Sequence, residues 1–161
     1  MKIKINNSIS FGNSEKPIII AEISANHSGK KKNFLELIRL AHKNGADLIK
    51  IQTYEPDDIV VKSKNKRYQI KGGIWDKKYL WDIYVKAQTP YRWHKSAFKL
   101  AKKIGATLFS TPFSIRAVDF LEKHRVKLYK IASLENTDVN LINRIAQTRK
   151  PIIISTGASN F

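Results

Sequence analysis

Short apolar runs alternate with amphipathic stretches along most of the chain. The apolar runs are rich in β-branched residues and lack a strict apolar–polar alternation, as expected of strands that are buried on both faces. We predict five such strands, at residues 18–22, 47–51, 107–109, 128–132 and 151–154. The intervening stretches have apolar residues at helical spacing, and they predict helices at residues 33–44, 96–104, 115–123 and 139–148.

Strands and helices that alternate in this way favour a parallel sheet with right-handed crossovers. Two helix-to-strand junctions resemble each other, because Gly45 and Gly105 each follow a predicted helix and are followed by alanine and then a strand. Glycine is common just past a helix end, where the backbone turns left-handed. One supersecondary unit is therefore repeated along the chain.

A long insertion, residues 55–89, separates the second and third predicted strands. It contains Gly72 and Gly73 and predicts a loop followed by a helix. Its aromatic residues include Trp75, Tyr79, Trp81 and Tyr84. Two interpretations fit this composition equally well: a lid over a substrate, or a segment that only packs against the rest of the domain.

The composition is typical of a single globular domain. The chain has 161 residues, 42% of them hydrophobic, and no cysteine, which excludes disulfide bonds and cysteine-based metal or redox sites. The first 14 residues are polar and lack the apolar segment of a signal peptide. The apolar run at residues 17–21 is far too short to cross a membrane. We therefore expect a soluble, cytoplasmic protein without membrane association.

The charge is strongly positive, since 30 Lys and Arg against 13 Asp and Glu give +17. Such a charge attracts polyanions, so a nucleic-acid-binding protein is one hypothesis. The lysines are spread over all the predicted helices, however, and their runs are not interleaved with aromatic residues as in a groove for single strands. We favour solvated helix faces together with a small anionic substrate.

Polar residues gather at the carboxyl end of every predicted strand, which is where parallel α/β sheets bind ligands. Lys50 and Lys130 alternate with large apolar neighbours, so both can point inward, where an uncompensated charge is costly. Two such lysines with nearby hydroxyls suit a ligand that carries phosphate and carboxylate groups. Glu22 and Glu135 would offset this charge or move protons. Alternatively, each lysine could pair with a carboxylate of its own. Because polar residues occur at the ends of all five predicted strands, we favour a ligand site.

Five segments at these strand ends resemble the motifs of the sialic acid synthase family. They are residues 20–29 (IAEISANHSG), 45–53 (GADLIKIQT), 109–113 (FSTPF), 130–135 (KIASLE) and 154–157 (ISTG). Each motif alone is weak, but together they follow the family's order and cover nearly the whole chain from Pro17. Within the insertion, residues 71–77 and 89–94 are most similar to the pseudaminic acid synthase branch.

The resemblance implies a (β/α)₈ TIM barrel that catalyses a condensation. C3 of phosphoenolpyruvate attacks the open-chain aldehyde of a 2,4-diacetamido-trideoxyhexose. Water then adds to the oxocarbenium carbon, and phosphate leaves by C–O cleavage to give a nonulosonic acid such as pseudaminic acid. A divalent metal, Mn or Mg, polarises the aldehyde in this family. Synthases of N-acetylneuraminate and of legionaminic acid are the alternatives within the family.

By motif position, the resemblance gives roles to eight residues. Glu22 contacts the sugar near its reacting end and Glu135 orients the water or stabilises the intermediate, so these two are the candidate catalytic residues. Gln52 supports the site. The residues that would hold phosphoenolpyruvate are Lys50, Thr111, Lys130, Ser133 and Ser155.

No metal ligand is expected within this chain. His27, just beyond the first strand, is interpreted as a loop-orienting residue, and His94 as a structural one. His42 and His124 lie on predicted helices and are interpreted as surface residues.

The chain extends only just past the fifth predicted strand, whereas a closed barrel of this class has eight strands and about 250 residues. In the family, strands six to eight, the metal-binding histidines and an antifreeze-like domain lie beyond this point. We therefore expect residues 1–161 to form a partial barrel that is marginally stable, self-associating and inactive alone. A second chain that completes the barrel is the alternative, and the family's homodimer is not assumed.

Two other interpretations remain. A different phosphoenolpyruvate-using or aldolase-like barrel, such as a 3-deoxy sugar acid synthase, would share the anion-binding strand ends but not the long insertion. A non-catalytic remnant would be expected to lose site residues, whereas Glu22, Lys50, Lys130 and Glu135 are all present.

Overall fold

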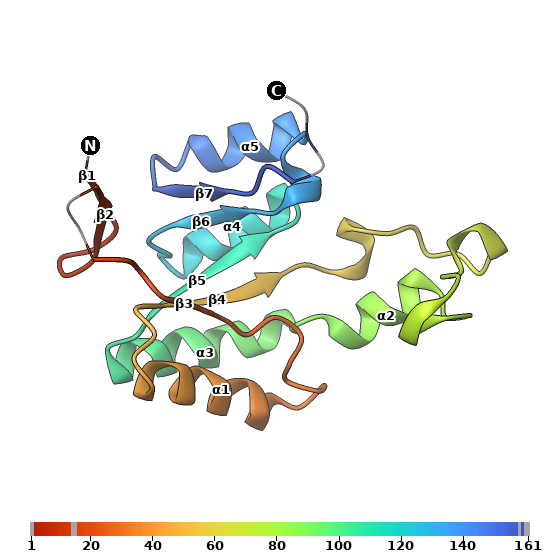
Figure 1. The fold of residues 1–161 in the computed structure, drawn as a ribbon, viewed down its shortest axis with the longest axis horizontal. Helices are drawn as coiled ribbons and strands as arrows, with labels where there is room; N and C mark the ends of the chain where they lie inside the picture. Colours follow the sequence, from red (N-terminus) through yellow and green to blue (C-terminus); the bar gives the residue numbers. More distant parts are fainter. Residues whose placement is uncertain (1, 14–15, 158, 160–161) are drawn as a thin grey trace.

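Five parallel strands form the central sheet, and they lie side by side in chain order (Figure 1). The computed structural model describes residues 2–13, 16–157 and 159. The strands are β3 (Ile20–Glu22), β4 (Leu48–Thr53), β5 (Thr107–Pro112), β6 (Tyr129–Ile131) and β7 (Ile152–Ile154). All five predicted strands are confirmed, and their ends differ from the prediction by up to three residues.

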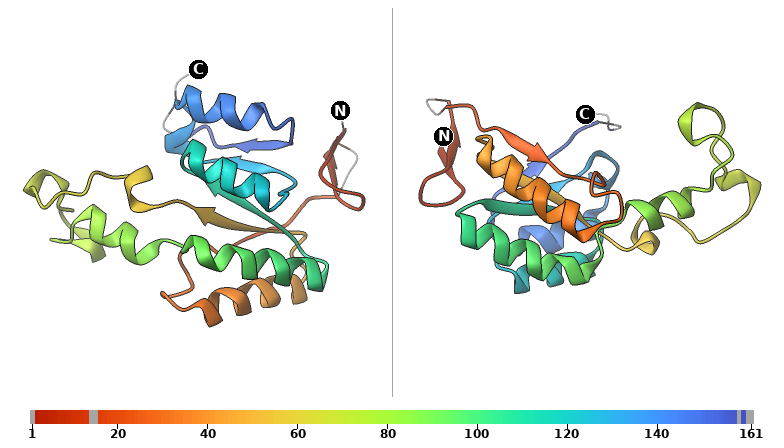
Figure 2. Two further views of the ribbon diagram at one scale, coloured as in Figure 1. Left: turned by 180° about the vertical axis from the view of Figure 1, so that it is seen from behind. Right: turned by 90° about the horizontal axis from the view of Figure 1, so that it is seen from below.

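Four helices cover the outer side of the curled sheet (Figures 1 and 2). They are α1 (Lys31–Lys43), α3 (Tyr91–Ile104), α4 (Ile115–Lys123) and α5 (Val139–Ala146), and they confirm the predicted helices. α3 begins five residues earlier than predicted, directly after Pro90, whose fixed φ suits a helix start. No helix in the described ranges is long and apolar enough to cross a membrane.

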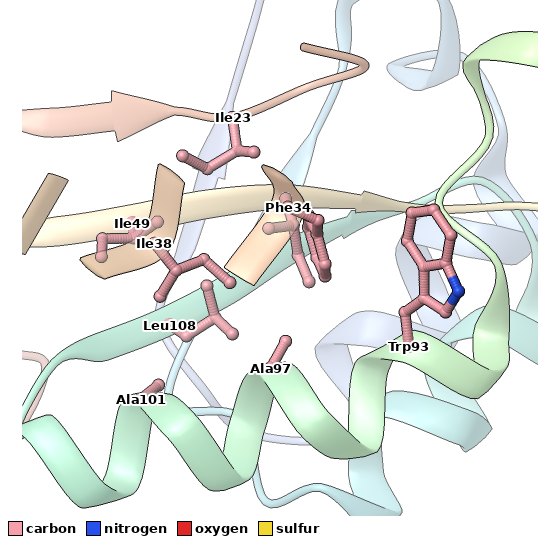
Figure 3. Packing of buried hydrophobic residues seen from close by; sticks show 9 residues of the cluster. Ile23, Phe34, Ile38, Ile49, Trp93, Ala97, Ala101 and Leu108 are labelled. Atoms are coloured by element: carbon pink, nitrogen blue, oxygen red, sulfur yellow. The ribbon is translucent and has the colours of Figure 1, made fainter. Parts of the chain in front are cut away.

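The larger hydrophobic core lies between the sheet and the helices α1 and α3. Figure 3 shows Phe34 and Ile38 of α1 and Ala97 of α3 directed toward Ile49 and Leu108 of the strands. These five side chains are at most 5% exposed, and full burial of a large apolar side chain contributes about 1.5–3 kcal/mol. A second core joins α4 and α5 to β6. Its buried members are Val118, Leu121, Val126, Tyr129, Ile131, Leu141 and Ile145.

An N-terminal β-hairpin, β1 (Lys2–Lys4) paired antiparallel with β2 (Ser10–Gly12), was not among the predicted elements. Its turn is held by the Asn6 side chain, whose oxygen accepts hydrogen bonds from the backbone N–H groups of Ser8 and Ile9. The Asn6 amide donates to Thr107 Oγ1, the first residue of β5, at 2.9 Å. The hairpin turn is therefore fixed to the amino end of the strands.

Apolar residues of this turn pack on the inner face of the sheet, the face opposite the helices. Ile5 and Ile9 pack against a cluster formed by Leu48, Phe109 and Leu128. These three residues come from β4, β5 and the start of β6, and they are fully buried. The inner face is thus apolar toward the amino end, which leaves its polar positions toward the carboxyl end.

The insertion between β4 and β5 forms an arm that projects beyond the carboxyl ends of the strands (Figure 1). It contains three 3₁₀ turns (Pro56–Asp58, Lys66–Tyr68 and Gly73–Trp75) and the helix α2 (Leu80–Ala87), so the predicted loop and helix are confirmed. Cation–π contacts stabilise the arm, with Lys78 over the Trp75 ring at 4.9 Å and Lys64 over the Tyr79 ring at 4.8 Å. Its function as a lid stays a prediction.

Candidate active site

Alternation along the strands directs one set of polar residues to the inner face. Glu22 of β3 lies in register with Lys50 of β4, and Gln52 of β4 with Thr111 of β5. Residues paired in register point to the same side of a sheet. On β6, Lys130 lies between Tyr129 and Ile131, both of which are buried in the helix-facing core. Lys130 therefore shares the inner face with Lys50.

Lys50 stands between a carboxylate and a hydroxyl. Its ammonium forms an ion pair with Glu22 and donates to Thr111 Oγ1 at 3.4 Å. Glu22 in turn accepts a hydrogen bond from the backbone N–H of Ser24 at 3.0 Å. Burial lowers the pKa of Lys50 to about 8, and the positive charge of Lys130 adds to the shift.

Lys130 is held differently, by neutral acceptors. Its Nζ donates to Ser155 Oγ at 2.6 Å and to the carbonyl of Ile131 at 2.5 Å. It forms no ion pair with any carboxylate in the described part of the chain. Burial lowers the pKa of Lys130, and the charge of Glu135 opposes this shift. Lys130 is therefore a partly desolvated cation whose direct hydrogen-bond partners are neutral, which is the state that an anionic ligand would stabilise.

Ser133 and Glu135 lie on a 3₁₀ turn (Ser133–Glu135) that directly follows β6. Burial raises the pKa of the Glu135 carboxyl, and its Oε2 atom is buried without a hydrogen-bond partner among the described residues. A Cβ atom at Gly157 would lie 3.1 Å from Ser133 Oγ. Glycine thus allows the loop after β7 to approach Ser133 closely.

Asn136 joins these two loops, and the sequence analysis did not identify it. Its Nδ2 donates to the carbonyls of Ser155 and Gly157, each at 3.3 Å, and also contacts Ser159 Oγ. The available signal was an amide directly after the motif that ends at Glu135. Asn136 fixes the backbone that carries Ser155, so it positions the partner of Lys130.

The structure therefore places all eight predicted site residues at the carboxyl edge of the sheet, in two neighbouring groups. Glu22, Lys50 and Thr111 form the first group, with Gln52 beside Thr111. The second group contains Lys130 of β6, Ser133 and Glu135 of the turn that follows it, and Ser155, which follows β7. The catalytic and binding roles of these residues remain predictions.

Ser110 belongs to a different network, on the helix-facing side of the same edge. It lies within the motif at residues 109–113, but alternation along β5 turns it away from Thr111. Thr53 Oγ1 lies 2.7 Å from Ser110 Oγ and 2.8 Å from His94 Nε2, and all three residues are fully buried. His94 Nδ1 lies 3.3 Å from the Pro90 carbonyl, so it carries the proton and Nε2 accepts from Thr53. As predicted, His94 is structural, because it links α3 to β4 and β5.

Comparison with known proteins decides the family. The model of the NeuB family matches residues 37–161, most of the chain. The chain belongs to the NeuB family. It is 46% identical over 147 residues to a pseudaminic acid synthase of Campylobacter jejuni, which covers 91% of this chain. A pseudaminic acid synthase of Helicobacter pylori is 43% identical over 88% of this chain, and an N,N'-diacetyllegionaminic acid synthase of C. jejuni is 35% identical over 91%.

Solved structures of NeuB-like proteins share the fold. An N-acetylneuraminic acid synthetase of Leptospira borgpetersenii superposes with a TM-score of 0.83 at 23% identity, covering 99% of this chain and 51% of that one. This likeness confirms the predicted TIM-barrel type. A 3-deoxy-D-arabino-heptulosonate 7-phosphate synthase of Thermotoga maritima, with a TM-score of 0.67 at 11% identity, shares the fold alone. The chain spans 43% of the length of the C. jejuni pseudaminic acid synthase.

The histidines of this NeuB-family chain do not form a metal centre. Among the described residues, no group of three or more His, Cys, Asp or Glu side chains could hold a metal ion. The described residues therefore do not by themselves fit the divalent metal that the family resemblance implies.

His27 and His124 are both packed against aromatic rings. His27 is fully buried, its Nδ1 accepts from the Gly29 backbone N–H at 3.0 Å, and its ring meets the edge of Trp93 at 5.3 Å. This agrees with its interpretation as a loop-orienting residue. The prediction that His124 is a surface residue is wrong, because it is half-buried and stacks on Phe98 at 4.8 Å. Its helix packs against the neighbouring helix at this point, which sequence periodicity does not reveal.

Proposed function

We propose that this chain provides the phosphoenolpyruvate-binding part of a synthase that joins phosphoenolpyruvate to a 2,4-diacetamido-trideoxyhexose, giving pseudaminic acid and phosphate. One observation carries the proposal. Lys50 and Lys130, from different strands, lie on one face at the carboxyl edge of the sheet, each beside a hydroxyl, Thr111 or Ser155. Membership of the NeuB family and 46% identity to a pseudaminic acid synthase supply the chemical context.

Phosphoenolpyruvate carries a phosphate and a carboxylate, and the two lysines offer one cation for each. With a pKa of about 8, Lys50 is mostly protonated at neutral pH, and a bound anion would stabilise that charge further. The hydroxyls of Thr111, Ser133 and Ser155 would donate to the remaining anionic oxygens. Since Lys130 donates only to neutral acceptors among the described residues, a bound anion would give it a direct negatively charged partner.

In the reaction, C3 of phosphoenolpyruvate forms a C–C bond to the aldehyde carbon, whose oxygen takes a proton. The oxygen of a water molecule then adds to C2, the water loses a proton, and phosphate leaves with the C–O bonding electrons. We assign Glu22 to the reacting end of the sugar, because it lies beside Lys50. We assign Glu135 to the water, since its carboxyl is buried at the edge of the site and its raised pKa makes it a stronger base.

The choice of sugar rests on the relatives and on the arm. The pseudaminic acid synthases are more similar to this chain than the 35% identical legionaminic acid synthase. A pocket of about 460 Å³ lies between the arm and the loop after β3, and its lining combines apolar and aromatic residues with charged ones (Ala25, Trp75, Lys77, Lys78, Tyr79, Asp82, Ile83, Lys86 and Ala87). The apolar part of this lining suits the methyl groups of a deoxy sugar, and the charged side chains could bind its polar groups. Legionaminic or N-acetylneuraminic acid synthesis, or an inactive fragment, are the alternatives.

Calorimetric titration with phosphoenolpyruvate tests the proposal directly. We compare three proteins at moderate salt: the wild-type chain, the Lys50→Ala/Lys130→Ala variant and a control variant, Lys31→Ala/Lys32→Ala. The control has the same change in charge, at the exposed start of α1. Saturable binding that is lost only in the Lys50/Lys130 variant supports a preformed site. Equal weak binding to all three proteins would show that attraction by net charge is the whole effect, and it would contradict the proposal.

A further inference from the structure

A second charged pocket lies at the opposite end of the sheet from Lys50 and Lys130. It has a volume of about 600 Å³ and is formed between α3 and the turn that joins α4 to β6. Thr107, the first residue of β5, and Asn6 of the hairpin turn also line it. Figure 2 shows the end of α3 and the N-terminal hairpin at the same end of the molecule. The pocket is built entirely from elements that the described residues contain.

Among the described residues, the lining of this pocket includes several cations and no carboxylate. Its basic residues are Lys95, Lys99 and Lys102 of α3, and Lys123, Arg125 and Lys127 around the turn. None of the six forms an ion pair in the described part of the chain. Other cations of the described residues behave differently: Arg116, Arg144 and Lys150 each pair with a carboxylate. The pocket is thus a local excess of positive charge, in which like charges repel one another.

The helix dipole explains only part of this arrangement. Cations in the last turn of a helix stabilise its carbonyl end, and Lys102 and Lys123 occupy such positions. Lys95 and Lys99 lie in the first and middle turns of α3, however, and Arg125 and Lys127 lie beyond α4. Four of the six cations therefore need another explanation.

Arg125 occupies a position that favours glycine. Its φ is 55°, in the left-handed region, at the second residue after α4, the place that Gly45 occupies after α1 with φ 88°. A side chain in this conformation costs on the order of 1 kcal/mol, which glycine avoids. Arg149 after α5 has the same φ of 55° but does not line the pocket, so it provides an internal control.

We propose that this pocket is a second anion-binding site, which takes a small molecule bearing a chain of phosphate groups. Its volume lies within the range of about 300–1,000 Å³ that is typical of small-molecule sites. A phosphate chain presents several negative charges over a short length, which matches cations placed on two sides of one pocket. Nucleic acid fits less well, because the Phe98 and His124 rings stack on each other and offer no platform for bases.

The test is a calorimetric titration with inorganic tripolyphosphate at about 0.15 M salt, where charges beyond about 8 Å are screened. Arg125→Gly should raise the Kd about three-fold, whereas Arg149→Gly, with the same charge change and the same backbone conformation, should leave it unchanged. Lys99→Glu/Lys127→Glu should abolish measurable binding, while Lys31→Glu/Lys32→Glu should not. The same comparison in the Lys50→Ala/Lys130→Ala background removes any binding of tripolyphosphate at the carboxyl edge of the sheet, so this site succeeds or fails independently of the proposed function.

Further titrations with other ligands identify the source of the phosphate chain. A nucleoside triphosphate that binds as well as tripolyphosphate supports recognition of the phosphates alone, and tighter binding supports a nucleotide ligand. Equal effects of the pocket and control variants, or no saturable binding to the wild-type chain, would overturn the proposal. So would a single-stranded oligonucleotide that binds and is not displaced by tripolyphosphate, because the surface would then belong to nucleic acid.

Discussion

The two ends of the sheet accommodate positive charge in different ways. At the carboxyl end, Lys50 and Lys130 are partly buried and donate to specific acceptors, and a fully buried histidine lies just behind them. At the amino end, cations such as Lys99 and Arg125 are exposed and have no carboxylate partner among the described residues. Burial shifts pKa values, whereas exposure leaves charges to be screened by salt. The carboxyl end should therefore respond mainly to pH, and the amino end mainly to ionic strength.

The largest expected effect is acid destabilisation through His94. Burial lowers its pKa from 6.5 to about 4, so between these values the unfolded chain binds a proton that the folded chain does not. The free energy of unfolding should therefore fall as the pH drops below 6.5, by about 3 kcal/mol at pH 4 from this group. Urea unfolding followed by circular dichroism at a series of pH values measures this loss.

His94→Gln is the matched variant, because glutamine can still accept from Thr53 and donate to the Pro90 carbonyl but does not titrate. Its stability should depend less on pH between 6.5 and 4 than that of the wild-type chain. If both proteins lost stability in parallel over this range, His94 would not be the group responsible.

Removing the hydroxyl at the centre of the same network should have the next largest effect. Thr53→Val keeps the shape of the side chain but leaves His94 Nε2 and Ser110 Oγ without their shared partner. Unpaired buried polar groups cost about 1–3 kcal/mol, so we expect a loss of about 2 kcal/mol in unfolding free energy. Thr53→Ser should recover most of it, and Thr137→Val, at an exposed position, should change little. If Thr53→Val did not change the unfolding free energy, the network would not be what joins α3 to the strands.

The anion site at the carboxyl end of the sheet should bind phosphoenolpyruvate more weakly at alkaline pH. Lys50 is charged below its pKa of about 8, so phosphoenolpyruvate binding should be constant up to about pH 7.5. Above pH 8 it should weaken by up to about tenfold per pH unit as the ammonium loses its proton. Calorimetry from pH 7 to 9.5 measures this dependence. Lys50→Arg, whose guanidinium stays protonated, should show no such decline even if it binds more weakly. An identical decline in both proteins would assign the effect to another group.

Much of this architecture was predictable because the strands are continuous apolar runs and the helices have strong apolar periodicity. The helix at Ile115–Lys123 was predicted to the residue, since Ser114 caps it and its apolar face is regular. The hairpin was missed because its strands have three residues each, with too few apolar positions to stand out. Its alternation of Ile3, Ile5, Ile9 and Phe11 around Asn6 was the available signal.

The sequence allowed us to predict which residues gather at the candidate site, but not the contacts between them. Lys50 and Lys130 could be placed on one face because each lies between large apolar neighbours. Alternation turns Ser110 to the opposite face from Thr111, but its contact with Thr53 could not be predicted without the pairing of β4 with β5. Asn136 acts across a loop contact, which no local pattern encodes.

The smallest expected effect is a difference in stability between variants of Arg125 and Arg149, the two arginines with a left-handed backbone conformation. Arg125→Gly and Arg149→Gly each relieve strain of about 1 kcal/mol, and the greater freedom of glycine in the unfolded chain offsets about half of it. Each variant should therefore be more stable by about 0.5 kcal/mol. Arg125→Gly also removes one of six mutually repelling cations, so at low salt it should stabilise more than Arg149→Gly. This difference should vanish as salt is added, because the charges around the pocket are exposed. Equal stabilisation by both variants at low salt would mean that the cations at the amino end do not interact, and that this end of the sheet is an ordinary solvated surface.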